Sequence, residues 1–343
     1  MKQKANTMKR IKLSLANQQV EFVDREQALK RIEEWVSRGV AFPQVIYGPE
    51  GCGKTAWLRQ SAELLRELGF DVIYVNPIEK EFMAELGIQR LKDKLTSLAR
   101  EVTSQLAWVR VTWSVIDVVR EAIRLGRGKI AIIIDDAFQV IGLDNAAIYV
   151  KGLLGILEHP PEPYERVVAI VATSEGVSRR EIGRHEWADI RPIWNMSKEG
   201  FKQLYDQLPG NKPDFEEVWR LTGGNPRMLE RLYESRWKLN AVIDELINRK
   251  ELTHDFVRKW LGHLREAVSD PDYLWYNAPE ELIDELIEKN LIMYFLPERD
   301  QWFWIDAPPP ERDPELGIGK YVAWQTPLHR EAIRRVLESS RRS

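Results

Sequence analysis

The sequence predicts an α/β fold in which a mostly parallel β-sheet carries helices on both faces, followed by a helical lid and a winged-helix unit. Between residues 20 and 192, helical patterns alternate with short runs of Val and Ile, the order typical of βαβ units. These runs are apolar at nearly every position, as central parallel strands are, because helices bury both of their faces. In addition, a glycine-rich turn joins the first run to a helix.

Local signals define the elements of the N-terminal part. The expected strands are residues 44–47, 71–76, 130–135 and 167–173. Residues 1–13 are basic, which indicates either a solvated tail or an edge strand. A first helix should span residues 25–38 and end near Gly39, and the helix after the glycine-rich turn should end near Gly69, since glycine commonly terminates helices. The stretch 79–128 predicts two or three more helices.

The C-terminal part is predicted to be mainly helical. Residues 197–249 contain helical patterns broken by a loop with Gly223, Gly224 and Pro226, and we interpret this segment as a lid. Two further helices and three aromatic-rich strands are expected at residues 253–268, 279–290, 291–296, 301–306 and 321–325. Two helices followed by a β-hairpin are the order of a winged helix. The expected domains are therefore residues 1–195, 196–250 and 251–343.

Composition limits the possible partners and location. At 343 residues, the chain exceeds the usual size of one hydrophobic core. Lys and Arg total 50 against 53 Asp and Glu, so no overall basic field attracts nucleic acid and any DNA contact has to be local. The one cysteine, Cys52, excludes an internal disulfide and fits a reducing compartment. Since no apolar run reaches the ~18 residues of a membrane span, we expect a cytoplasmic protein without a membrane partner.

Gly48, Gly53, Lys54 and Thr55 match the pattern G-x-x-x-x-G-K-[ST] of a phosphate-binding loop, or P-loop. The pattern lies between a strand and a helix, so backbone N–H groups and the helix dipole converge on one point. Lys54 would neutralise the phosphates of ATP or ADP, and the Thr55 hydroxyl would coordinate Mg²⁺. The alternative is a plain glycine turn. The residues expected to contact the nucleotide here are Gly48, Pro49, Glu50, Gly51, Cys52, Gly53, Lys54, Thr55 and Ala56.

Two carboxylates follow the buried run 130–134. Nucleotide hydrolysis needs one acidic group near the metal ion and a second group that orients the attacking water. We therefore expect Asp135 at the magnesium site and Asp136 as the catalytic group that activates water, with Lys54 as a further catalytic residue. Asp136 could instead serve only as a helix cap.

The last predicted strand of the sheet ends at Thr173, whose hydroxyl would lie between these two sites. We expect this hydroxyl to act in catalysis by bonding the γ-phosphate or the attacking water. A hydroxyl that only caps the next turn is the alternative. If the protein forms an oligomer, four downstream arginines are candidates for a finger that reaches a neighbouring subunit's nucleotide: Arg179, Arg180, Arg184 and Arg191.

Together these residues resemble the archaeal ATPases of the STAND branch, which are P-loop proteins related to the AAA+ class. Besides the P-loop and the paired Asp, residues 22–26 (Phe-Val-Asp-Arg-Glu) resemble the family motif F-V-G-R-E. Residues 223–227 (Gly-Gly-Asn-Pro-Arg) resemble its G-x-P motif, and the C-terminal part resembles its winged-helix module. The resemblance covers residues 20–337.

The resemblance implies roles for residues outside the P-loop. Val23 and Arg25 would lie beside the adenine, Pro226 would touch it from the lid, and Arg227 would act as a sensor of the nucleotide. ATP would then open and close the lid against the core. An ordinary loop between two helices is the alternative for Pro226.

Two residues depart from the family patterns. Asp24 stands where glycine is usual, and Glu175 replaces the arginine of the motif T-S-R at the end of the expected strand 167–173. The role of that arginine therefore does not transfer to this chain, and hydrolysis is expected to be slow or to need a partner.

Two functions are open from the sequence. The first is a Mg²⁺-dependent, ATP-hydrolysing switch whose lid and winged-helix domain respond to the nucleotide and bind a macromolecular partner, most simply a protein. The second is an AAA+-like motor or loader that binds DNA through the C-terminal domain. The expected recognition helix, residues 279–290, carries five acidic residues and one lysine, which favours the switch because DNA phosphates repel such a face. Arginines near the C-terminus keep the DNA function open, and a scaffold that never hydrolyses ATP would leave Asp136 without a role.

Overall fold

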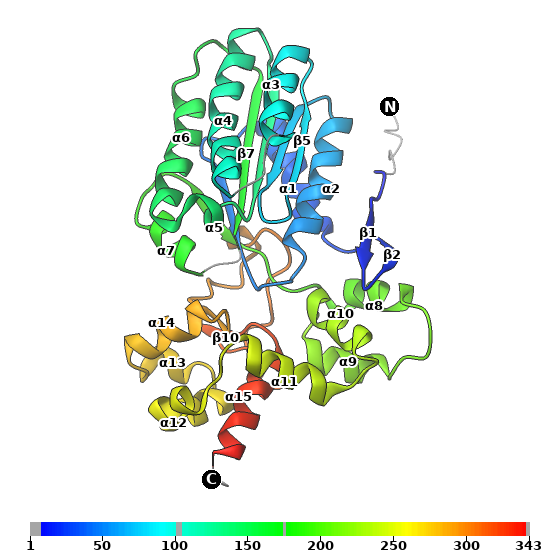
Figure 1. The fold of residues 1–343 in the computed structure, drawn as a ribbon, viewed down its shortest axis with the longest axis vertical. Coiled ribbons are helices and arrows are strands. Elements are labelled where there is room, and N and C mark those ends of the chain that lie inside the picture. Colours follow the sequence, from blue (N-terminus) through cyan, green and yellow to red (C-terminus); the bar gives the residue numbers. More distant parts are fainter. Residues whose placement is uncertain (1–7, 101–104, 174–175, 341–343) are drawn as a thin grey trace.

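The computed structural model describes residues 8–100, 105–173 and 176–340. Figure 1 shows two lobes stacked along the longest axis, a lobe built on a β-sheet and a helical lobe. The sheet lobe confirms the predicted α/β fold with a mostly parallel sheet. Glu175 and residues 1–7 of the expected tail lie outside the described residues.

Six strands form the central sheet, in the order β5-β4-β6-β7-β3-β8, and all neighbouring pairs are parallel except β4 with β5. The strands are β3 (Gln44–Tyr47), β4 (Asp71–Asn76), β5 (Glu81–Glu85), β6 (Lys129–Asp135), β7 (Arg166–Thr173) and β8 (Asp189–Pro192). Strands β3, β4, β6 and β7 are the four that the apolar runs predict. Because β7 lies between β3 and β6, the predicted P-loop and carboxylate sites meet at one edge of the sheet, on either side of Thr173.

Helices cover both faces of this sheet (Figure 1). One face packs against α1 (Glu26–Arg38) and α2 (Lys54–Glu67). The other packs against α3 (Gln89–Arg100), α4 (Gln105–Arg124), the short α5 (Phe138–Ile141), α6 (Ala146–Glu158) and α7 (Gly176–Gly183). Successive strand residues alternate between the two cores: Ile132 belongs to one hydrophobic cluster and Ile133 to the other. This alternation explains why the central strands are apolar at consecutive positions.

The two edge strands of the sheet are not predicted by the sequence patterns. β5 begins and ends with glutamate, and its charges make the stretch resemble a surface helix. An edge strand tolerates such charges because one of its sides stays open to solvent. β8 is short and only half-buried over most of its length, which leaves no apolar run to detect.

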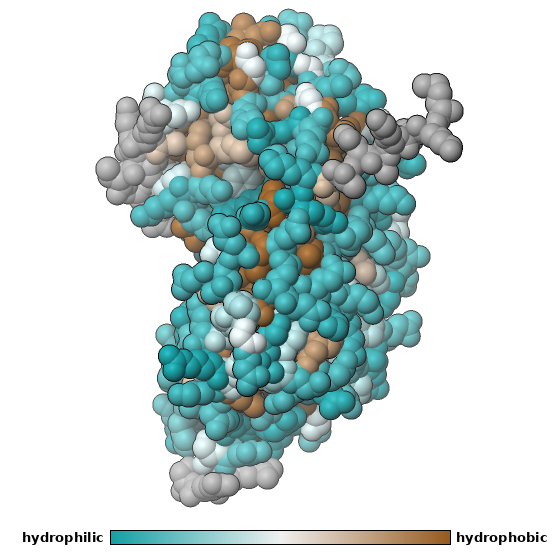
Figure 2. All heavy atoms as spheres, turned by 90° about the vertical axis from the view of Figure 1, so that its right-hand side faces the viewer, coloured by the Kyte–Doolittle hydropathy of each residue, from teal (hydrophilic) through white to brown (hydrophobic). Residues whose placement is uncertain are grey.

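An N-terminal hairpin of β1 (Lys12–Leu15) and β2 (Gln18–Glu21) connects the two lobes. Leu15 and Val20 pack into the core of the helical lobe. The backbone just before β1 bonds to the Gln60 side chain on α2 of the sheet lobe (2.9 Å). Figure 2, a view from the right-hand side of Figure 1, shows hydrophobic side chains gathered between the lobes on an otherwise mostly hydrophilic face.

The helical lobe contains one hydrophobic cluster that spans both predicted C-terminal units. Its helices are α8 (Lys198–Gln207), α9 (Phe215–Thr222), α10 (Pro226–Glu234), α11 (Leu239–Arg249), α12 (His254–Ser269), α13 (Tyr273–Tyr276), α14 (Glu280–Glu288) and α15 (Pro327–Ser339). The boundaries predicted at residues 195 and 250 stay predictions. Each helix in the described ranges is too short or too polar to cross a membrane.

The C-terminal strands differ from the prediction. β9 (Ile292–Tyr294) pairs with β10 (Val322–Trp324), whereas residues 301–303 form a 3-10 helix instead of a strand. The Asp300 carboxylate accepts a hydrogen bond from the Trp302 N–H (2.7 Å) and so starts this turn. The following Trp304 and Ile305 are apolar because they are buried against the sheet lobe, not because they alternate in a strand.

Candidate functional site

The P-loop joins β3 to α2 and encloses the ammonium group of Lys54. Lys54 Nζ donates hydrogen bonds to the carbonyl oxygens of Gly48 (3.0 Å) and Pro49 (2.9 Å), and the side chain is buried. The ammonium therefore lies at the start of α2, where the first N–H groups of a helix lack intrahelical acceptors. A lysine and a helix N-terminus at one point form a binding site for an anion such as phosphate.

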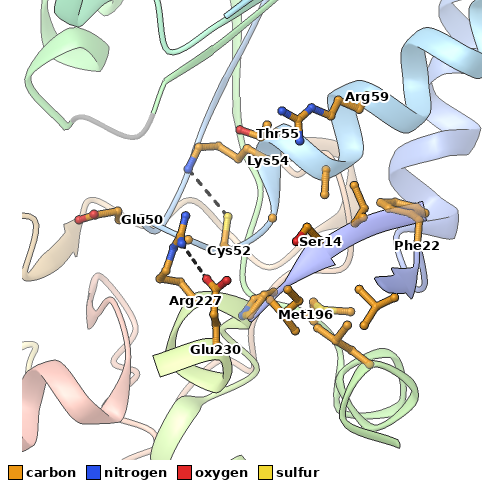
Figure 3. A pocket seen from close by; sticks show the side chains of 18 of the residues that line it. Ser14, Phe22, Glu50, Cys52, Lys54, Thr55, Arg59, Met196, Arg227 and Glu230 are labelled. Carbon is orange, nitrogen blue, oxygen red and sulfur yellow. Dashed lines mark hydrogen bonds and ion pairs between the residues drawn. The ribbon is translucent and has the colours of Figure 1, made fainter. Parts of the chain in front are cut away.

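A cavity of about 490 Å³ lies over this loop, within the size range of small-molecule sites. Figure 3 shows Lys54, Thr55 and Arg59 on one side of it, and Phe22 and Met196 on another. The apolar lining residues are Leu13, Leu15, Val20, Phe22, Val23, Ala56, Ile78, Met196, Leu204 and Pro226. A nucleotide has the same division, since its base is flat and largely apolar and its phosphates are charged.

Most residues predicted to contact the nucleotide line this cavity. They are Val23, Arg25, Glu50, Gly51, Cys52, Gly53, Lys54, Thr55, Ala56, Pro226 and Arg227, and Asp136 joins them. Gly48, Pro49, Asp135 and Thr173 are absent from the lining. Gly48 and Pro49 instead act through their carbonyl groups on Lys54.

Asp135 is the last residue of β6 and is fully buried, and its two carboxylate oxygens have different environments. Oδ2 accepts hydrogen bonds from the Tyr74 hydroxyl (3.0 Å) and the Asn76 amide (2.9 Å), both on β4. Oδ1 has no hydrogen-bond partner within the described part of the chain. Burial, and after it the charge of Asp136, raises the pKa of Asp135 to about 7, although the neighbouring Thr55 hydroxyl lowers it.

The open oxygen of Asp135 fits a metal ion that is bound together with phosphate. A buried acceptor without a partner is unfavourable unless a ligand completes it. Mg²⁺ is usually held by one or two protein groups, with phosphate oxygens and water completing its shell. No group of three or more His, Cys, Asp or Glu side chains in the described ranges could hold a metal ion alone. Asp135 and the adjacent Thr55 hydroxyl are thus the protein groups suited to Mg²⁺ beside a bound nucleotide.

Asp136 and Thr173 occupy different environments. The backbone of Asp136 turns into the left-handed region (φ 47°), and its N–H bonds to the Ala172 carbonyl on β7 (3.1 Å). This turn separates the two carboxylates, so that Asp136 lines the cavity while Asp135 stays buried. Thr173 is buried at the end of β7, paired with Tyr47 of β3.

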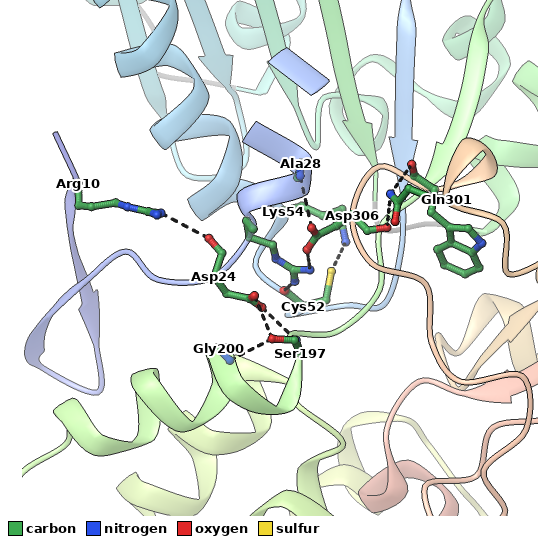
Figure 4. Close-up of polar contacts among 11 residues, drawn as sticks. Arg10, Asp24, Ala28, Cys52, Lys54, Ser197, Gly200, Gln301 and Asp306 are labelled. Atoms are coloured by element: carbon green, nitrogen blue, oxygen red, sulfur yellow. Dashed lines mark hydrogen bonds and ion pairs between the residues drawn. The ribbon is translucent and has the colours of Figure 1, made fainter. Parts of the chain in front are cut away.

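Asp24, which stands where the family motif has glycine, ties the start of α1 to the helical lobe. Its φ is 65°, a conformation that glycine would adopt with less strain. Its carboxylate accepts hydrogen bonds from the N–H and the hydroxyl of Ser197, both 3.0 Å long, at the start of α8 (Figure 4). Gly200 makes room for this contact, because an added Cβ would lie 2.2 Å from Asp24 Cγ. These hydrogen bonds offset the backbone strain.

Arg25 links the P-loop to residues 295–306, which we call the C-terminal segment. Its buried guanidinium donates to the Cys52 carbonyl and forms an ion pair with Asp306 (2.9 Å). Asp306 also accepts the backbone N–H of Ala28 on α1 (3.3 Å), which Figure 4 shows beside the ion pair. Arg25 borders the cavity, as predicted, but its guanidinium bonds hold protein groups together.

The N-terminus of α10 packs directly on the P-loop. An added Cβ on Gly51 would lie 2.2 Å from Arg227 Cβ, so only glycine permits this approach. The Arg227 N–H donates to the Gly51 carbonyl (3.3 Å). Asn225 donates to the Glu50 carbonyl (3.0 Å), while its own oxygen caps α10 by accepting the Met228 N–H (3.1 Å).

Glu50 of the P-loop contacts both parts of the helical lobe. Its N–H donates to the side-chain oxygen of Gln325 (2.9 Å), and its carboxylate pairs with Lys250 (2.7 Å). Burial favours a raised pKa for Glu50, but Lys250 outweighs it and holds the pKa below the usual value. The backbone of the P-loop is therefore fixed by segments remote in sequence.

Sequence reasoning missed several polar residues of this site. Tyr74 and Asn76 are two positions apart on a strand next to β6, so they share a face, and this spacing could have indicated them. Asn225 directly precedes a proline that begins a helix, a typical capping position. Nothing near Gln325 in the sequence marks its contact with Glu50.

The four arginines proposed as fingers lie away from the nucleotide cavity. They line a second cavity bounded by α7, β8 and the C-terminal segment. Arg180 is paired with Asp284 and Arg184 with Glu181. Whether any of the four reaches the nucleotide of another subunit stays open as a prediction.

Comparison with solved structures finds chains of low similarity. The ORC1 protein of Aeropyrum pernix in complex with DNA is 14% identical, with a TM-score of 0.40, and the match covers 93% of each chain. AMPPCP-bound DnaA from Aquifex aeolicus is 16% identical, with a TM-score of 0.36 over 76% of this chain and 74% of DnaA. The ORC2 protein of Aeropyrum pernix is 13% identical, with a TM-score of 0.36 over 92% and 94%. These scores carry no inference about ligands or partners of this chain.

Sequence comparison identifies the family. No curated protein matches the chain. The family described as "ATPase domain predominantly from Archaea" matches residues 22–232, more than half of the chain. This match contains the P-loop, the carboxylates that end β6 and the first turns of α10. The chain therefore belongs to this family of ATPase domains predominantly from Archaea.

Proposed function

We propose that the protein is a Mg²⁺-dependent ATPase that works as a switch, in which ATP and ADP favour different contacts between the P-loop and the helical lobe. One observation carries this proposal. The buried ammonium of Lys54 follows β3 and the open oxygen of Asp135 ends β6, on either side of β7, beside a cavity that α10 borders. This combination suits a phosphate chain with its metal ion and exposes the bound ligand to a second lobe.

Each residue of the site has a chemical task in this proposal. Lys54 neutralises the β- and γ-phosphates, and Thr55 and Asp135 hold Mg²⁺, which offsets the charge of the reacting phosphoryl group. Asp136, on the lining of the cavity, orients the attacking water and accepts its proton. Thr173 lies between the two strands and would bond the γ-phosphate or this water.

The contacts of α10 support the switching part. Arg227 and Asn225 bond to backbone groups of the P-loop, and Pro226 borders the same cavity. A nucleotide that touches Pro226 would therefore alter the contacts between the lobes. We also infer that the chain belongs to the STAND branch, with a lid at residues 196–250 and a winged helix at 251–343. The runs 22–26 and 223–227, and the order α12, α14, β9, β10, support this.

A macromolecular partner would bind one position of the helical lobe in preference to another. A protein is favoured over duplex DNA because α14, the expected recognition helix, exposes acidic side chains, two of which pair with Lys259 and Arg180. The alternative function is a DNA motor or loader of the AAA+ kind. ATPase rates with and without duplex DNA separate the two, since strong stimulation by DNA would favour the motor.

Lys54→Ala tests the nucleotide site itself. The variant should lose binding of a fluorescent ATP analogue, because no other side chain replaces the ammonium at the start of α2. Its melting temperature should stay near that of the wild type. Affinity within about threefold of the wild type, a difference of about 0.65 kcal/mol, would contradict the assignment.

Asp135→Asn and Asp136→Asn separate the metal site from catalysis. Asp135→Asn should raise the Mg²⁺ concentration needed for tight binding of the ATP analogue. Asp136→Asn should leave this binding unchanged and slow hydrolysis. If Asp136→Asn hydrolyses ATP at the wild-type rate, Asp136 has no catalytic role.

A further inference from the structure

A second cavity, of about 710 Å³, lies between the sheet lobe and the C-terminal segment and shares no lining residue with the nucleotide cavity. Two kinds of side chain dominate its walls, arginines and aromatic rings: Arg179, Arg180, Arg184, Arg191, Tyr47, Phe295, Trp302 and Phe303. Only two acidic residues, Asp189 and Glu280, line it. The cavity is therefore locally positive, although the whole chain has a net charge of −3.

Among the residues that the structure describes, two of these arginines form no ion pair. Arg180 and Arg184 each form an ion pair. Within the described ranges, Arg179 and Arg191 form none, and they donate instead to a backbone carbonyl (3.3 Å) and to the amide oxygen of Gln44 (3.0 Å). A guanidinium that forms no ion pair and borders a cavity can bind an external anion.

The same two arginines lie over aromatic rings. Arg179 lies 5.0 Å from the ring centre of Tyr47 and 5.1 Å from that of Phe295. Arg191 lies 5.6 Å from the ring centre of Trp302. These distances are in the range of cation–π contacts, which hold the guanidinium groups in place without neutralising them.

Exposed aromatic rings concentrate around this cavity. Of the five exposed aromatic side chains in the described ranges, four lie between residues 276 and 303: Tyr276 (66% exposed), Phe295 (48%), Trp302 (62%) and Phe303 (43%). The fifth is Phe42, on the sheet lobe. Large rings are normally mostly buried, so a local excess of exposed rings indicates a surface that binds a partner.

The rings continue from the cavity onto the outside of the helical lobe. Phe295 lies 5.9 Å from Trp275, which stacks on Tyr321 at 5.0 Å with an angle of 16° between the ring planes. Tyr321 in turn contacts the exposed Tyr276 at 5.8 Å. Lys320 lies over Tyr321 at 5.0 Å. These rings form a continuous series with Arg179 over Phe295 and Lys320 over Tyr321, and we call this series the aromatic track.

We propose that the second cavity and the aromatic track bind single-stranded nucleic acid. An unpaired nucleotide carries both groups that the surface can bind, since its base stacks on rings or guanidinium planes and its phosphate pairs with an arginine or lysine. An acidic peptide would use the arginines but leave most of the rings exposed. In a duplex the bases are stacked on each other, and the acidic face of α14 beside the cavity repels a broad array of phosphates. This inference goes beyond the ATP switch and does not depend on it.

Fluorescence anisotropy with a labelled thymidine oligonucleotide tests the proposal on the full chain. The wild type should bind the single strand at protein concentrations below about 100 μM, the weak end of non-specific nucleic-acid binding, and the affinity should fall with added salt. Trp302→Ala and the double variant Arg179→Ala/Phe295→Ala should each weaken binding at least about tenfold, or about 1.4 kcal/mol. Trp302 is mostly exposed, so its removal should not affect folding.

Two matched variants serve as controls. Phe42→Ala removes an exposed ring and Arg258→Ala an exposed arginine, both outside the cavity lining, and neither should change binding of the oligonucleotide. Trp302→Ala, Phe42→Ala and Arg258→Ala should bind the fluorescent ATP analogue as the wild type does, which separates this proposal from the one on the P-loop. The proposal is wrong if the wild type does not bind the oligonucleotide, if it binds a matching duplex equally well, or if Trp302→Ala leaves the affinity unchanged. It is also wrong if thymidine monophosphate, at the same concentration of nucleotides, or a poly-glutamate peptide displaces the oligonucleotide.

Discussion

Replacing Asp306 by alanine should destabilise the protein strongly, because Asp306 compensates a buried positive charge. The side chains of Arg25 and Asp306 are only 3% and 7% exposed, and their charged atoms lie 2.9 Å apart. Asp306→Ala removes the ion-pair partner of the guanidinium and the acceptor of the Ala28 N–H. Removing one partner of such a pair costs about 3–5 kcal/mol of unfolding free energy, against about 0–1 kcal/mol for a surface pair.

A double variant distinguishes an uncompensated charge from lost packing. Arg25→Met/Asp306→Leu removes both charges and should be more stable than Asp306→Ala alone, since neither ion of this pair then remains buried. Recovery should stay incomplete because the variant also loses the donor to the Cys52 carbonyl. A double-mutant cycle on these positions then gives the coupling energy of the pair.

Urea unfolding, followed by both tryptophan fluorescence and circular dichroism, measures these changes, and agreement of the two signals checks for a single transition. Lys202 and Asp206 provide the control, since they form an ion pair at 2.7 Å with side chains 52% and 55% exposed. Asp206→Ala should cost at most about 1 kcal/mol. If Asp306→Ala costs no more than this control, the argument from burial is wrong.

Three further predictions concern Tyr74, the buried His329 and Pro226. Tyr74→Phe should lower stability by about 1 kcal/mol and raise the Mg²⁺ concentration needed for binding of the ATP analogue, because Asp135 loses one of the donors that orient it. Burial lowers the pKa of His329 to about 3, so the folded protein disfavours the charged form that the unfolded chain takes up below about pH 6.5. The free energy of unfolding should therefore be about 2 kcal/mol lower at pH 5 than above pH 6.5. Urea unfolding at the two pH values should show a smaller difference for His329→Gln. Pro226→Ala should weaken ATP binding modestly, and ATP should protect the amides of residues 223–229 from hydrogen exchange, whereas unchanged exchange would remove this loop from the nucleotide site.

Much of the sheet lobe could be predicted because its signals are local. An apolar run of consecutive residues is enough to indicate a central strand, and G-x-x-x-x-G-K-T is a contiguous pattern with one backbone geometry. The order of the strands, with β7 between β3 and β6, comes from the structure and was not predicted. The edge strand β5 could not be predicted in this way. One side of an edge strand is open to solvent, so it can carry charged residues, and the same residues are also typical of a surface helix.

The aromatic-rich C-terminal segment is misread for a different physical reason. Trp304 and Ile305 look like part of a strand, yet they are buried because they pack on the sheet lobe after a 3-10 turn. An apolar composition indicates that a segment is buried, but it does not indicate which surface of the protein buries it. The same limit applies to Arg25 and Asp306, which are 281 positions apart and show no periodic relation in the sequence.

These distant contacts have a common target that explains how the lobes and the nucleotide can be coupled. Arg25 binds the carbonyl of Cys52, while Asn225 and Gln325 bind the carbonyl and the N–H of Glu50. Three segments of the chain therefore fix the backbone that would surround the phosphates. A ligand that shifts this backbone changes the free energy of all three contacts. Because coupling between binding free energies is reciprocal, any partner that moves the helical lobe must in turn change the affinity of the P-loop for its nucleotide.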